Sequence, residues 1–156
     1  MATCMKFLLC ALCVSVAILA AADKKPLVKP DSPEEKALFQ ARTEGDPAKR
    51  LALLDAFVQK FPESAPAAHA AYLDHYLETK EWDKALEYGR KAYEADNEDE
   101  DIPINLMKAA VGKGDLAAAV EWGSVAGALM GKVLAAKPAD VDEASLNTRR
   151  VQLEYA

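Results

Sequence analysis

A stretch of sequence that recurs after 34 residues constrains this chain more than any other feature. Residues 82–92 (WDKALEYGRKA) align with residues 116–126 (LAAAVEWGSVA). Identical residues fall at Ala85/Ala119, Glu87/Glu121, Gly89/Gly123 and Ala92/Ala126. A fixed period of this length indicates a stack of two-helix units, each of which can bury its apolar face only against a neighbour.

The small residues of the repeat share one face of a helix. Ala85, Gly89 and Ala92 are spaced i, i+4 and i+7, which places them on one side of an α-helix. Small side chains at these positions would let the second helix of a pair lie close against the first. The residues expected to pack the repeats are Tyr72, Leu73, Tyr76, Ala85, Gly89, Ala92, Ala119, Gly123 and Ala126.

These residues resemble the tetratricopeptide repeat (TPR), a pair of antiparallel helices with aromatic and small anchor residues. The resemblance covers residues 32–136, as units 32–64, 66–99 and 100–136. It implies an all-α fold, an αα-hairpin repeat solenoid of about three repeats plus a C-terminal helix. The stretch Phe61-Pro62-Glu63-Ser64 is further similar, over a short length, to repeat proteins of the bacterial envelope.

The first unit carries clear helix signals. Ser32-Pro33-Glu34-Glu35 predicts a capping box that opens a helix ending near Gly45. Asp46-Pro47 predicts the start of a second helix, and Pro62 its end. Arg50 stands where the family usually has a small residue, which predicts looser packing or an atypical terminal unit.

The N-terminus has the pattern of an export signal. Lys6 precedes the uncharged run Phe7–Ala22, which ends in three alanines, and this predicts a signal peptide over residues 1–22. An uncleaved membrane anchor is the alternative, although the run is short for a membrane span. The Lys- and Pro-rich residues 23–31 predict a disordered linker. We therefore expect an exported protein, periplasmic or secreted, with no membrane span after signal removal.

The C-terminal segment, residues 137–156, leaves two alternatives open. Lys137-Pro138 should end the preceding helix near Ala136, after which an amphipathic pattern predicts one more helix. That helix either closes the stack as a cap or begins a truncated fourth repeat. The lack of an evident polar outer face favours the truncated repeat.

Composition and motifs argue against several classes of function. The net charge is −6 with no dense basic cluster, which argues against nucleic-acid binding. All three cysteines lie in the first thirteen residues. The only histidines, His69 and His75, would point about 120° apart on one helix, and we expect them at the surface or in the groove. The acidic run Asp96–Asp101 lacks the spacing of a calcium loop. We expect no enzyme activity, cofactor or metal.

A repeat stack of this family binds through its concave face, which the first helix of each unit forms. The resemblance implies that the binding groove holds Phe39, Arg42, Asp74, Leu77, Asn105 and Lys108. The carboxylate clamp of some family members is not supported, because Ala67, Ala70, Ala71 and Asp74 replace its basic residues. We expect a scaffold or adaptor of the bacterial cell envelope that binds a protein or peptide partner. The alternative is an accessory or regulatory segment of a larger enzyme or secretion complex.

Overall fold

The computed structural model describes residues 26–136, which form six α-helices and one 3₁₀ helix and contain no strand. Their order is α1 (Pro33–Thr43), α2 (Pro47–Lys60), η1 (Pro62–Ala68), α3 (His69–Glu78), α4 (Trp82–Ala95), α5 (Asp101–Lys113) and α6 (Leu116–Ala136). This part of the chain is therefore all-α, as the sequence predicts. The expected signal peptide, residues 23–25 of the expected linker and the C-terminal segment 137–156 lie outside the described residues.

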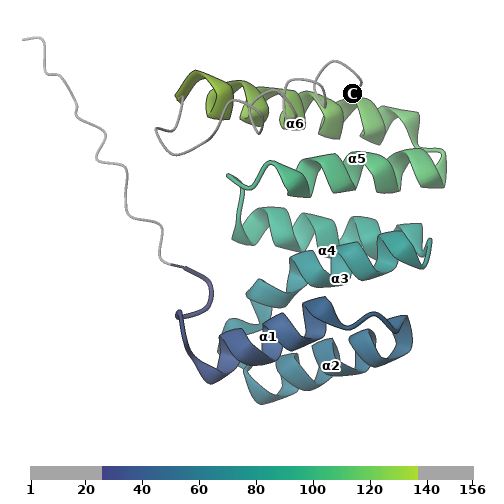
Figure 1. Ribbon diagram of the computed structural model, residues 1–156. Helices are drawn as coiled ribbons and strands as arrows, with labels where there is room; N and C mark the ends of the chain where they lie inside the picture. The colour runs from purple at the N-terminus through teal and green to yellow at the C-terminus, as the bar shows by residue number, and fades with distance from the viewer. Residues whose placement is uncertain (1–25, 137–156) are drawn as a thin grey trace, which may run out of the picture.

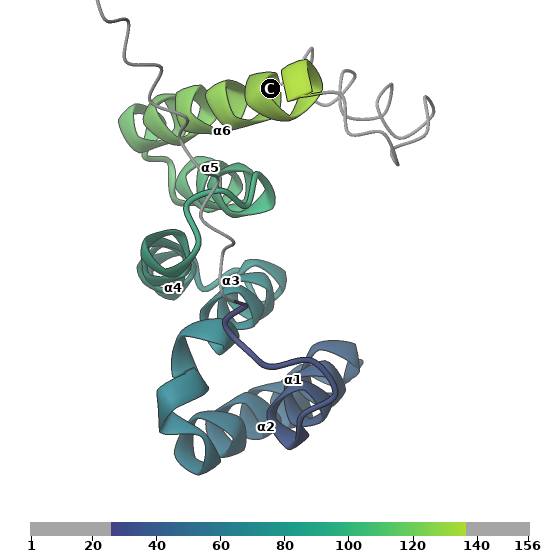
Figure 2. The same cartoon turned by 90° about the vertical axis from the view of Figure 1, so that its left-hand side faces the viewer.

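The helices pack in chain order. α1 packs against α2, α3 against α4, and α5 against α6, while α4–α5 and α3–α5 contacts join the last two pairs. Figure 1 shows the three pairs following one another from one end of the molecule to the other. In Figure 2, which views several helices nearly end-on, α3 and α4 lie on opposite sides of the middle layer. Among the described helices, none combines the length and the apolar character that crossing a membrane requires.

Short polar signals start the first two helices. Ser32 caps α1 by accepting a hydrogen bond from the backbone N–H of Glu35, at 3.1 Å. The carboxylate of Glu35 reaches the N–H of Asp31 at 2.7 Å, one residue before the position that a capping box requires. Asp31 has a positive φ of 59°, and the N–H of Ser32 already bonds to Lys29. The predicted capping box is therefore only half formed.

Two segments differ from expectation. Residues 62–68 form the 3₁₀ helix η1, because Pro66 has no N–H and disfavours an α-helical turn before it. Residues 26–31, expected to be part of a disordered linker, are placed, and Val28 packs against the core. Leu27 and Val28 supply apolar surface for this packing, although the segment as a whole is rich in Lys and Pro.

The repeat-packing residues lie in or beside one core. Ala85, Ala92, Ala119 and Ala126 are all buried, as are Tyr72, Leu73 and Tyr76. Gly89 is buried where three helices meet: a Cβ built there would lie 2.5 Å from Leu106 Cδ2 of α5 and 3.2 Å from Leu73 Cδ1 of α3. Gly123 is half-buried, and its Cβ would lie 3.1 Å from the sulfur of Met107. The absence of a side chain at Gly89 thus lets both α3 and α5 pack closely against α4.

An aromatic group fills the space between α3 and α4. The rings of Tyr72 and Tyr88 stack at 4.6 Å between centroids, and Tyr76 lies 5.4 Å from Tyr88. The hydroxyl of Tyr72 donates to the carboxylate of Asp55 on α2 at 2.6 Å. Burial and this hydrogen bond raise the pKa of Tyr72. The bond joins the first helix pair to the second.

Candidate functional site

A cavity opens where α1, α3 and α5 face one another. Its volume is about 270 Å³, and its apolar lining comes from α3 and α5. The lining residues are Arg42, Arg50, Ala70, Ala71, Leu73, Asp74, Asp99, Asp101, Ile102 and Asn105. A second cavity of about 260 Å³ shares Arg42, Ala70, Asp99 and Ile102 with the first, and adds Leu27, Pro66, Ala67, Ala92 and Asp96. We call the two together the Arg42 groove.

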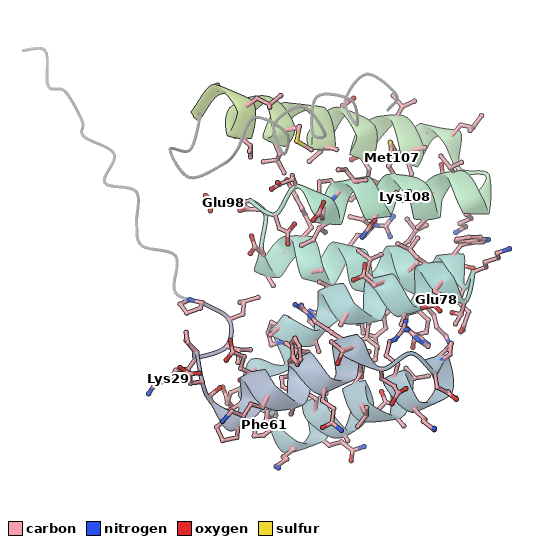
Figure 3. The ribbon with its side chains drawn as sticks, viewed as in Figure 1. Lys29, Phe61, Glu78, Glu98, Met107 and Lys108 are labelled. Carbon is pink, nitrogen blue, oxygen red and sulfur yellow. The ribbon has the colours of Figure 1, made fainter. Side chains whose placement is uncertain are left out.

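Three of the six residues predicted for the binding groove line this cavity. Arg42, Asp74 and Asn105 come from α1, α3 and α5, and so each helix pair supplies one of them. The Nδ2 of Asn105 donates to Asp74 Oδ1 at 3.0 Å, and Lys108 Nζ donates to Asn105 Oδ1 at 3.1 Å. Figure 3 labels Lys108 on α5. Lys108 thus adjoins the groove through Asn105 without lining either cavity.

The other two predicted residues do not line the groove. Phe39 lies on α1 with 67% of its surface exposed, and so it is not a core residue. Leu77 is half-buried and packs against the core. The sequence predicts both residues on the first helices of their units, and they lie on those helices. The helix to which a residue belongs does not by itself determine the direction in which its side chain points.

Arg50 is a groove residue that the sequence prediction did not include. Its side chain is 14% exposed; Nε donates to the backbone oxygen of Glu44 at 2.8 Å, and Nη1 pairs with the carboxylate of Glu78. Glu78 is the last residue of α3 (Figure 3). Arg50 therefore joins the α1–α2 turn to the second helix pair. The available signal for a special role was that Arg50 stands where the resemblance to the TPR implies a small residue.

The loop before α5 supplies two acids of the groove. Asp96 Oδ1 accepts the N–H groups of Glu98 and Asp99, and Asp99 Oδ1 accepts the N–H of Asp101. These bonds shape the turn that ends α4 and begins α5. Asp101 is the first residue of α5, where the helix dipole favours negative charge.

Two of the groove acids, Asp74 and Asp99, have raised pKa values. Burial raises the pKa of Asp74, Arg42 and Lys108 partly offset the rise, and Asp101 and Asp99 add to it. Burial also raises the pKa of Asp99, against the hydrogen bond from the backbone of Asp101. Both carboxyl groups therefore lose a proton less readily than they would in water.

One of the two histidines, His75, is placed differently from the prediction. His75 is 3% exposed and meets Tyr76 edge-on at 5.0 Å, so the expected surface or groove position is wrong for it. His69 is half-buried, 6.0 Å from the ring of Tyr88. The Nδ1 atoms of both are buried, and no partner for either is found among the described residues. Burial lowers the pKa of both histidines.

A third cavity lies on the other side of the stack. It has a volume of about 560 Å³ and opens between the end of α4 and the second half of α6, lined by Tyr93, Asn97, Glu98, Leu129, Lys132 and Val133. Among its described lining residues, Glu98 is the one acid and Lys132 the one base. Within residues 26–136, no group of three His, Cys, Asp or Glu side chains is arranged so that it could hold a metal ion.

Comparisons with models of known protein families, with curated proteins and with solved structures gave no significant match. Function must therefore be argued from the repeat pattern and the geometry of the groove.

Proposed function

We propose that this chain is an exported TPR-like repeat protein that binds a segment of another protein in the Arg42 groove. One observation carries the proposal: Arg42, Asp74 and Asn105, selected from the sequence for such a groove, line one cavity. The 34-residue period and the three helix pairs in chain order support the TPR-like solenoid. In such a stack, α1, α3 and α5 form the concave face.

The groove chemistry favours binding over catalysis. Its lining contains carboxylates, two arginines, an asparagine and apolar side chains, and within the described part of the chain it includes no serine, threonine, cysteine or histidine. Covalent catalysis by a hydroxyl or thiol nucleophile needs such a side chain with a base in reach, and the described lining of the groove offers neither group. We therefore propose a scaffold or adaptor that is not an enzyme.

Export to the bacterial cell envelope is part of the proposal. It is supported by the uncharged run and the three alanines before Asp23. The cysteine-free body of the chain needs no disulfide bond, which suits a periplasmic location as well as a secreted one.

Site-specific crosslinking in the native host tests the binding proposal. A photoreactive lysine analogue is placed at Lys108, beside the groove, or at Glu121 on the exposed face of α6. We expect a covalent adduct with a partner protein from position 108 and none from position 121. Adducts from position 121 alone would contradict binding in the groove.

A specific feature favours the alternative, an accessory segment of a larger assembly. Leu116 and Val120 lie one turn apart on α6 and are 71% and 72% exposed. In a stack of helix pairs, the last pair leaves such an apolar face open unless another helix covers it. The mass of the mature product in the native host distinguishes a short protein from a segment of a longer one.

A further inference from the structure

The basic side chains of the Arg42 groove are largely engaged within the protein. Arg50 is held by the backbone oxygen of Glu44 and by the carboxylate of Glu78. Arg42 Nη2 donates to the backbone oxygen of Ala67 at 3.3 Å. These bonds tie the first helix pair to the turn and helix that follow, and so the arginines have a structural role before any ligand binds.

The acids of the groove have more unused capacity to accept hydrogen bonds. Asp74 accepts one, from Asn105, and Asp99 accepts one from the backbone N–H of Asp101. No hydrogen bond to the Asp101 carboxylate is found among residues 26–136. An ionised carboxylate offers about four lone-pair sites, so most of the acceptor capacity of Asp74 and Asp101 faces solvent or a ligand.

Among the described residues, the Arg42 groove also carries fewer positive charges than negative ones. The charges of Arg50 and Glu78 neutralise each other. Arg42 and the neighbouring Lys108 then remain beside the carboxylates of Asp74, Asp99 and Asp101. Around the first cavity, in the part of the chain that the structure describes, two positive charges thus face three negative ones. Burial is the main cause of the raised pKa values of Asp74 and Asp99, and neighbouring carboxylates add to the rise.

We propose that the segment bound in the Arg42 groove carries an arginine or lysine side chain, whose charged end lies among Asp74, Asp99 and Asp101. This inference rests on the proposed function and names the chemistry of the partner. The methylene stem of the side chain would lie along Leu73 and Ile102, since long basic side chains bury their stems on apolar surface. A cavity of about 270 Å³ suits one long side chain, because sites for whole drug-sized ligands span roughly 300–1,000 Å³.

An acidic segment fits this groove less well. Its carboxylate would enter beside three carboxylates, and like charges brought together across an interface disfavour binding. Arg42 and Arg50 would also have to leave or share the bonds that they make within the protein.

The test measures binding of the full mature chain to three synthetic nonapeptide pools. The pools share the same randomised apolar and small flanking residues and differ only at the central position, which is arginine, its neutral isostere citrulline, or glutamate. Affinities are compared by isothermal titration calorimetry at low salt and again at high salt. The protein variants are Asp74→Asn and Asp101→Asn, with Glu121→Gln as a control that makes the same charge change on the exposed face of α6.

We expect the arginine pool to bind about tenfold more tightly than the citrulline pool, a difference in binding free energy of about 1.4 kcal/mol. The two aspartate variants should lose most of this preference, Glu121→Gln should keep it, and added salt should weaken it. Equal binding of the pools, or tightest binding of the glutamate pool, overturns the cationic partner while groove binding stands. Absence of binding by every pool, with thermal melts showing folded protein, overturns both.

Discussion

Replacing Gly89 by alanine is the sharpest probe of how the helix pairs fit together. The added Cβ would lie 2.5 Å from Leu106 Cδ2 and 2.8 Å from Leu106 Cγ. Leu106 is fully buried and cannot swing into solvent to make room. Overpacking of a tight core costs roughly 1–3 kcal/mol, whereas glycine to alanine inside a helix gains up to about 1 kcal/mol. We therefore expect Gly89→Ala to lower the free energy of unfolding by about 1 kcal/mol.

Two other glycines in helices provide matched controls. A Cβ at Gly127 meets nothing within 4 Å, so Gly127→Ala should stabilise by about 0.5–1 kcal/mol through helix propensity alone. At Gly123, which is equivalent to Gly89 in the repeat, the Cβ meets the flexible side chain of Met107 at 3.1 Å. Gly123→Ala should fall between the other two, because methionine adapts to irregular packing.

Urea denaturation of the three variants measures these differences directly. The gap between Gly127→Ala and Gly89→Ala isolates the packing contribution, expected at roughly 1–3 kcal/mol. Adding Leu106→Ala to Gly89→Ala should remove most of that contribution, as a double-mutant cycle would show. If Gly89→Ala stabilises the protein as much as Gly127→Ala does, the close approach of α4 and α5 is not as described.

Four further predictions concern single side chains and the N-terminus. Arg50→Met removes an ion pair with the half-exposed Glu78 and a part-buried, charge-assisted hydrogen bond, and should lower the free energy of unfolding by roughly 1.5–3 kcal/mol in urea melts. Burial lowers the pKa of His75, so as the pH falls below the ordinary value of 6.5 the unfolded state should take up a proton at His75 before the folded state does. The free energy of unfolding should therefore decline as the pH falls, and His75→Gln should flatten that decline. Phe39→Ala should change stability by less than about 0.5 kcal/mol in thermal melts, since this side chain is largely exposed. Intact-mass measurement on the exported protein should show loss of residues 1–22, and retention of the cysteines would refute export processing.

Much of the helix pattern could be predicted from the sequence because its signals are local. Ser32, Asp46 and Pro62 mark helix boundaries through hydrogen bonds and backbone constraints that involve only nearby residues. α6 is helical up to Ala136, the last described residue, so the predicted helix end near Ala136 falls at the limit of the described residues. Gly114, with φ of 83°, ends α5 in the left-handed conformation that glycine adopts readily.

The side-chain arrangement was harder to predict from the sequence, because it depends on contacts between residues that are far apart in the chain. Arg50 lies 28 residues from its partner Glu78, and no local pattern predicts that its long side chain would span two helix pairs. His75 is buried, and periodicity indicates the helix face on which it lies but not which neighbours cover that face. The Arg42 groove likewise draws residues from α1, α2, η1, α3, α4 and α5, from the segment before α1 and from the loop before α5.

Hydrogen exchange on the mature chain, with and without the partner captured at position 108, tests the central claim most directly. Binding in the Arg42 groove predicts slower amide exchange on α1, α3 and α5, and in the loop around Asp99, when the partner is present. It predicts little change along the exposed face of α6 near Leu116 and Val120. Protection confined to α2, α4 and α6, with the groove helices unchanged, would contradict the account.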